Sequence, residues 1–88
     1  MENKISFSGK KAWDANRDSM SFQVEVNGKK ARCLISREAL EDNYGADRVT
    51  INQAFDTNKN KIEAVAIKII NRGQVDKNGE YLIRSQGV

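Results

Sequence analysis

The densest run of potential ligands in the chain is a stretch of acidic and amide residues. Asp14, Asn16, Asp18 and Glu25 stand at positions 1, 3, 5 and 12 of a Ca²⁺-binding EF-hand loop, where oxygen ligands are needed. Position 6 is Ser19, although the sharp turn of such a loop requires glycine. Glu25 also lies in an alternating pattern that is typical of a strand and not of an exiting helix. The run therefore predicts an Asx-rich turn, and we expect no bound metal.

The chain contains no histidine and a single cysteine, Cys33. Histidine is the commonest general base and a frequent metal ligand, so its absence excludes a Ser-His-Asp site, a Cys-His site and a structural zinc site within one chain. Cys33 falls on the same face of a predicted strand as Ala31 and Ile35, which predicts a buried core residue and not a reactive thiolate. We therefore expect a non-enzymatic protein without a cofactor.

Two clusters of basic residues could contact phosphate groups if folding brings them together. The first is Lys10 and Lys11, and the second is Lys29, Lys30 and Arg32. The net charge is +3, with 15 basic against 12 acidic residues, which indicates a mixed surface with a mild attraction for anions. The chain lacks the aromatic-rich strand of an RNA-recognition motif. Solvated surface charge is the favoured interpretation, and a nucleic-acid-binding accessory protein is the alternative function.

Three apolar residues are candidates for a protein interface. Trp13 is either an exposed recognition anchor or, as we favour, a residue that covers the edge of the core. Leu34 and Leu82 point away from the main apolar face of their strands, and could form an apolar patch on the open side of the sheet. We therefore favour a protein-interaction or regulatory module that binds a protein partner or associates with itself.

Strand and turn signals dominate the first part of the chain. Ile5–Phe7 predicts a short strand, and residues 8–11 are expected to break it. Between Met20 and Val26 apolar and polar residues alternate, which predicts a strand with one face on the core. Asn27-Gly28 is the strongest short hairpin signal, so Lys29–Ile35 is the expected return strand.

Helical signals follow. Ser36 is a predicted N-cap and Gly45 a predicted left-handed terminator of a short helix. A capping-box pattern at Thr50 begins a longer helix that closes at Gly73. Its apolar stripe stays in phase throughout, although residues 56–60 are poor helix formers and allow a bend there.

A last strand at Tyr81–Arg84 completes the order β-β-β-α-α-β, which predicts an α+β fold. We expect one two-layer domain over residues 1–88, with its core at about 5–84, flexible termini, a mainly antiparallel sheet and both helices on one face. No apolar run approaches the roughly 18 residues of a membrane span, and the N-terminus lacks the apolar segment of a secretory signal. Since a single cysteine gives no sign of an oxidising compartment, a cytoplasmic protein is expected.

The order and spacing of residues along most of the chain resemble a known family. The positions that carry the resemblance are Phe7, Trp13-Asp14, Arg17, Phe22–Val24, Cys33–Ser36, Ala39-Leu40, Phe55, Asn58, Ile62-Glu63, Ala66, Ile69 and Gly73–Gly79. From about residue 5 to residue 84 the chain resembles the small bacterial proteins grouped as domain of unknown function family 1488. The resemblance implies a compact α+β fold and a bacterial origin, and it implies no activity, cofactor or catalytic residue.

Overall fold

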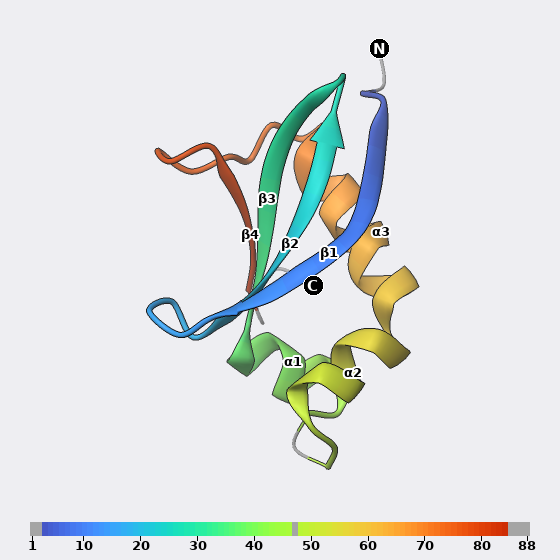
Figure 1. The fold of residues 1–88 in the computed structure, drawn as a ribbon, viewed down its shortest axis with the longest axis vertical. Coiled ribbons are helices and arrows are strands. Elements are labelled where there is room, and N and C mark those ends of the chain that lie inside the picture. The colour runs from blue at the N-terminus through green and yellow to red at the C-terminus, as the bar shows by residue number, and fades with distance from the viewer. Residues whose placement is uncertain (1–2, 47, 85–88) are drawn as a thin grey trace.

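The computed structural model describes residues 3–46 and 48–84, which form one sheet and three helices (Figure 1). The strands run in the order β1-β2-β3-β4; the first three pair antiparallel, and β4 runs parallel to β3. This confirms the α+β class, with three helices in place of the predicted two. The termini were expected to be flexible, and this prediction falls mainly on residues 1–2 and 85–88, which lie outside the described residues. The elements are β1 (Ile5–Asp14), β2 (Ser19–Val26), β3 (Lys29–Ser36), α1 (Arg37–Tyr44), α2 (Ile51–Thr57), α3 (Lys59–Asn71) and β4 (Glu80–Ile83).

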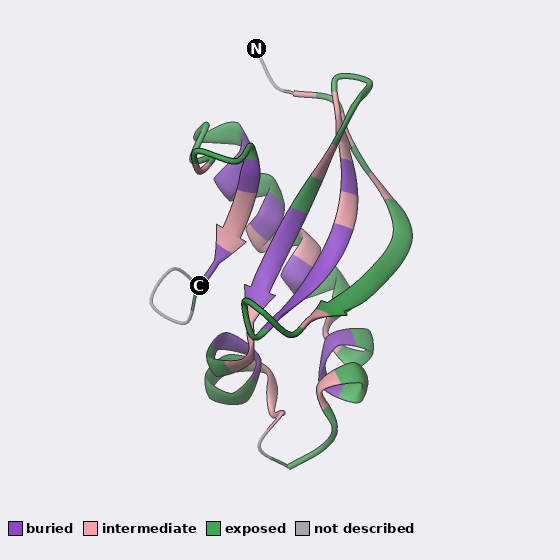
Figure 2. Cartoon of the chain, turned by 60° about the vertical axis from the view of Figure 1, so that its left-hand side comes forward, coloured by how far each residue is buried: buried purple, intermediate pink, exposed green. Residues whose placement is uncertain are grey.

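One hydrophobic core fills the space between the sheet and the helices. Alternate residues of the strands point into it, because successive side chains of a strand face opposite sides. Figure 2 shows the buried residues concentrated along β2, β3 and the inner faces of the helices. The core includes Met20, Phe22, Val24, Cys33 and Ile35 from the sheet, and Leu40, Phe55, Ile62, Ala66 and Ile69 from the helices.

The other set of strand residues forms the second side of the sheet, which we call the open face. It is defined by Ala12 of β1, Ser21 and Gln23 of β2, Lys30, Arg32 and Leu34 of β3, and Glu80 and Leu82 of β4. The helices contribute to the core on the opposite side only. The open face is therefore the broad surface on which polar strand residues are gathered.

Strand β1 is longer than predicted, because residues 8–11 do not end it. The pairing with β2 shifts between Phe7 and Lys11, so residues 8–10 of β1 stand opposite Gln23 alone. Gly9, with a φ of 85°, takes the left-handed conformation that such a bulge uses. Two extra residues leave the alternation of the strand unchanged, so Lys11 and Trp13 stay on the same side as Phe7. A bulge of this kind also makes an exposed edge strand a poor partner for another chain.

The long helix predicted after Thr50 is two helices, α2 and α3, separated by Asn58. Asn58 has a φ of −107°, and its Nδ2 donates to the carbonyl oxygens of Ala54 at 2.9 Å and Tyr44 at 3.1 Å. An asparagine side chain that hydrogen-bonds nearby carbonyl groups competes with the helical ladder, which explains the break. The bend therefore falls within the segment of poor helix formers.

The predicted helix caps are confirmed. The Ser36 hydroxyl accepts a hydrogen bond from the backbone N–H of Ala39 at 3.0 Å, and α1 ends at Gly45, which has a φ of 79°. At the start of α2, Thr50 and Gln53 form both hydrogen bonds of a capping box. These local contacts fix where each helix leaves the sheet.

Candidate functional site on the open face

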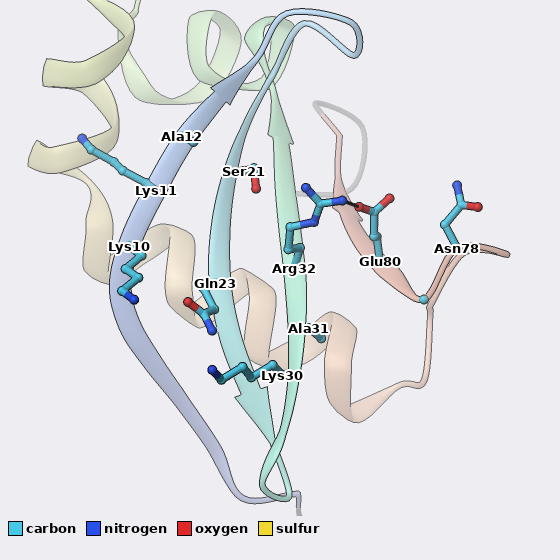
Figure 3. A pocket seen from close by; sticks show the side chains of 11 residues that line it. Lys10, Lys11, Ala12, Ser21, Gln23, Lys30, Ala31, Arg32, Asn78 and Glu80 are labelled. Atoms are coloured by element: carbon cyan, nitrogen blue, oxygen red, sulfur yellow. Dashed lines mark ion pairs between the residues drawn. The ribbon is translucent and has the colours of Figure 1, made fainter.

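A groove of about 560 Å³ crosses the open face from β1 to the start of β4 (Figure 3). We call it the basic groove. Polar and charged side chains of all four strands and of the turn before β4 surround it. They are Lys10, Lys11, Ser21, Gln23, Lys30, Arg32, Asn78 and Glu80. The groove thus brings together both lysines of the first predicted basic cluster and two residues of the second.

The two lysines of the first cluster separate. Lys11 points toward α2, where its Nζ lies 2.5 Å from Oδ1 of Asp56 and 5.2 Å from the ring centre of Phe55. Figure 3 shows Lys11 directed at the helices, away from Gln23 and Lys30 of the groove. The prediction that Lys10 and Lys11 act together as one basic cluster is therefore corrected, because consecutive strand residues face opposite sides of the sheet.

Lys29 is not among the residues that line the basic groove. It follows the Asn27-Gly28 turn and pairs in register with Val26, so it belongs to the opposite parity from Lys30 and Arg32. The two basic clusters therefore meet in part: Lys10, Lys30 and Arg32 line one groove, and Lys29 does not.

The end of the groove is formed by a buried carboxylate between two arginines, which we call the Arg17–Glu80–Arg32 bridge. Glu80 is only 4% exposed. Its Oε1 accepts a hydrogen bond from Nη1 of Arg17, and its Oε2 lies 2.8 Å from Nη2 of Arg32. The hydrogen bond to Glu80 raises the pKa of Arg17. Two cations compensate the cost of burying this carboxylate, which would be large for an unpaired charge.

The turn before β4 holds Glu80 in place. Oδ1 of Asp76 accepts hydrogen bonds from the backbone N–H groups of Asn78 at 2.8 Å and Glu80 at 2.9 Å. The hydrogen bond from the Glu80 backbone is the main cause that lowers the pKa of Asp76, and the bond from Asn78 adds to it. The parallel register then sets Glu80 directly opposite Arg32 on β3.

The basic groove presents more hydrogen-bond donors than acceptors. Oε1 of Gln23 accepts from the Ser8 hydroxyl at 3.3 Å, and Oε1 of Glu80 accepts from Arg17. Oε2 of Glu80 lies 2.8 Å from Nη2 of Arg32 as an ion pair but accepts no hydrogen bond from the described residues. Among the described residues, the ammonium groups of Lys10 and Lys30 form no ion pair. The side chain of Arg32 is 56% exposed and its contact with Glu80 uses one nitrogen. The groove therefore suits a ligand that is rich in acceptors and negatively charged.

The predicted interface residues lie in different environments. Trp13 is 37% exposed, on the helix side of β1, and the guanidinium carbon of Arg37 lies 5.0 Å from its ring centre. Leu34 is 1% exposed, so it offers no surface to a partner and the predicted patch is corrected at this residue. Leu82, its partner in the parallel register, is half-buried.

The acidic run that resembles an EF-hand forms the predicted turn. Oδ1 of Asp14 accepts from the backbone N–H groups of Asn16 at 3.1 Å and Arg17 at 3.3 Å, and Asp18 pairs with Arg37. No group of three or more metal-ligating side chains gathers anywhere in residues 3–46 and 48–84. Asp14 and Asp18 thus each have protein partners that explain their places.

Cys33 is fully buried in the core, and burial raises the pKa of its thiol from 9.0 to about 12. At pH 9.0 roughly one molecule in a thousand would then carry a thiolate, since each pKa unit is a factor of ten. We expect iodoacetamide to alkylate the native protein at least about a hundredfold more slowly than the same protein unfolded in urea. Mass spectrometry of timed samples measures both rates, and equal rates would contradict the burial of Cys33.

Comparisons with known proteins agree with this architecture. The model of the family described as "Protein of unknown function (DUF1488)" matches residues 5–83. The chain belongs to the DUF1488 family. Among solved structures, a DUF1488 protein of unknown function from Shewanella loihica PV-4 is similar, with a TM-score of 0.78 and 22% sequence identity over 94% of each chain. At that identity the likeness shows a shared fold. The comparison with curated proteins gives no match.

Several groove residues of this DUF1488 protein were not predicted as site residues. The most important is Glu80, and Ser21, Gln23 and Asn78 also line the groove. Arg17, which pairs with Glu80 from outside the groove, was not predicted either. Gln23 could have been found from its alternation with Phe22, but no local signal pairs Arg17 with a glutamate 63 positions later.

In the described part of the chain, no helix has both the length and the apolarity to cross a membrane.

Proposed function

We propose that this DUF1488 protein is a cytoplasmic, non-enzymatic interaction domain that binds an acidic segment of a partner protein in the basic groove. The observation that carries the proposal is the donor-rich groove on the sheet face opposite the helices. The cytoplasmic part of the proposal is supported by the lone cysteine, which forms no disulfide.

The chemistry of the groove supports an acidic protein segment. Carboxylates accept strong charge-assisted hydrogen bonds from lysine and arginine. Lys10, Lys30 and Arg32 supply the positive charge, and Glu80 is the one carboxylate in the lining. A concave site can enclose glutamate and aspartate side chains that extend from a chain lying over the sheet.

A nucleic acid is less well suited to this surface. Proteins that bind single strands stack bases on aromatic side chains, and all six aromatic residues here lie elsewhere. Phe7, Phe22 and Phe55 form a chain of ring contacts in the core, with centroid distances of 6.1 and 5.3 Å. Tyr44 and Tyr81 pack against that core, and Trp13 stands on the helix side of β1 beside Arg37.

The proposal is tested with a fluorescent peptide that contains four consecutive glutamates, and with a serine peptide of the same length. The double variant Lys10→Ala/Lys30→Ala is expected to weaken binding of the glutamate peptide about tenfold, since two partly enclosed charge contacts are lost. Fluorescence polarisation at low and moderate salt measures both affinities, and binding should weaken as salt increases.

The matched control is Lys61→Ala/Lys68→Ala, which removes the same charge from exposed positions of α3. It should change the affinity by less than about twofold, because surface charges distant from a site act only through a screened field. Equal weakening by both double variants, or no binding of the glutamate peptide at low salt, would overturn the proposal. Tighter binding of a labelled oligonucleotide, lost with Lys10 and Lys30, would assign the groove to nucleic acid instead.

A further inference from the structure

A second hollow, of about 770 Å³, lies next to the basic groove and around β4. We call it the arginine hollow. Three arginines, Arg17, Arg72 and Arg84, line it together with Glu38. Its apolar lining consists of Leu34, Leu82, Ile69 and Ile83, of which Leu34, Ile69 and Ile83 are buried and Leu82 is half-buried. The hollow therefore combines positive charge with the aliphatic surface of Leu82.

The two sites are neighbours on the same strands. Arg32 and Glu80, which line the groove, pair across β3 and β4, and Leu34 and Leu82 form the pair two residues further on. A strand rises about 3.3 Å per residue, so the two rows are about 7 Å apart. The Arg17–Glu80–Arg32 bridge joins them, because Glu80 lines the groove and Arg17 lines the hollow.

The charged lining of the arginine hollow is mainly positive, with three arginines and one carboxylate. Among the described residues, Arg72 and Arg84 form no ion pair. Arg17 is held by Glu80, with its side chain 38% exposed. Leu82 is half-buried, so part of its side chain is available for apolar contact. An occupant that fits all of these features carries an aliphatic side chain with a carboxylate close by.

We infer that one partner segment occupies both sites, with glutamates or aspartates in the basic groove and an aliphatic side chain against Leu82 in the arginine hollow. This inference rests on the proposed function. The distance between the rows corresponds to at least about two residues of an extended segment, since each spans about 3.3 Å. The partner is thus an acidic segment in which a leucine-like residue follows the acidic group after a short interval.

The test compares three fluorescent peptides of equal length. The first has four glutamates, two serines and a leucine; the second has serine in place of the leucine; the third has the leucine directly before the four glutamates and no leucine after them. The first peptide is expected to bind about tenfold more tightly than the second, since burying a leucine side chain contributes at least that factor. It should also bind more tightly than the third if the bound direction and spacing are as inferred.

Variants of the protein separate the two sites. Leu82→Ser should remove the preference for leucine, so that the first two peptides bind within about twofold of each other, while Lys10→Ala/Lys30→Ala should weaken both peptides alike. Arg84→Ala keeps Leu82 in place and provides a second test, with an expected loss of about threefold or more for the leucine peptide. Thermal melting of each variant confirms that it is folded.

The outcomes distinguish this inference from the proposed function. If the glutamate peptides bind through Lys10 and Lys30 and the leucine makes no difference, the arginine hollow is not part of the surface, and the inference is wrong while the proposed function stands. If no glutamate peptide binds, both are wrong. A leucine preference that persists in the folded Leu82→Ser variant would also overturn the inference.

Discussion

Replacing Ile62 with alanine is expected to lower the free energy of unfolding by about 2–5 kcal/mol. Ile62 is fully buried at the start of α3 and belongs to the core between the helices and the sheet. Alanine would remove its apolar contacts and leave a cavity, because a close-packed core relaxes only in part. In a domain of 88 residues this loss is a large share of the total stability. Urea unfolding followed by circular dichroism measures it.

The matched control is Ile67→Ala, which makes the same chemical change on the same helix. Ile67 is 37% exposed, and its replacement should cost less than about 1 kcal/mol because little cavity is formed. If both variants lost similar stability, the orientation of α3 on the sheet would be wrong. A small loss for Ile62→Ala alone would show that the core is loosely packed at this point.

Replacing Glu80 with glutamine is expected to cost about 1–3 kcal/mol of stability, and to weaken binding of an acidic peptide. Glutamine keeps the shape of the side chain but removes the charge that Arg17 and Arg32 share. Breaking a fully buried ion pair costs about 3–5 kcal/mol, and we expect less here because the side chains of the two arginines are 38% and 56% exposed. Urea unfolding measures the stability, and fluorescence polarisation measures the affinity.

The control for this variant is Glu25→Gln. Glu25 lies on the same side of the sheet, is half-buried, and forms no ion pair with the described residues. Its replacement should change stability by less than about 0.5 kcal/mol. A Glu80→Gln variant as stable as the original protein would contradict the structural role of the Arg17–Glu80–Arg32 bridge. Unchanged peptide affinity would show that Glu80 does not position Arg32 for binding.

Features that depend on neighbouring residues could be predicted from the sequence. The alternation from Met20 to Val26 and the Asn27-Gly28 turn predicted the central hairpin, and β2 and β3 pair along their whole length. Ser36 and Thr50 were predicted as N-caps because a cap needs only a side chain and a backbone N–H three residues later. Such signals operate over a few residues, so tertiary packing rarely overrides them.

Other predictions were wrong where one local signal is compatible with two different structures. Gly9 and the residues around it were read as the end of a strand, whereas the chain accommodates them as a bulge within β1. The error at the bulge also grouped Lys10 with Lys11, although a continuous strand sends them to opposite faces. Leu34 was expected to be exposed from its place in the alternation, but the structure buries it on the open face.

The sequence by itself determined the α+β class, the central hairpin, the helix caps and the burial of Cys33, because each follows from local periodicity or turn chemistry. Only the tertiary structure decided which charged residues meet. The parallel pairing of β4 with β3 sets Glu80 opposite Arg32 across 48 positions of sequence, and Arg17 reaches the same carboxylate from the β1–β2 turn. That pairing depends on how α1, α2 and α3 return the chain to the sheet, and no local pattern records it. The residues of the candidate site are therefore brought together by the order and pairing of the strands, whereas the core residues of the strands follow from their alternation of apolar and polar positions.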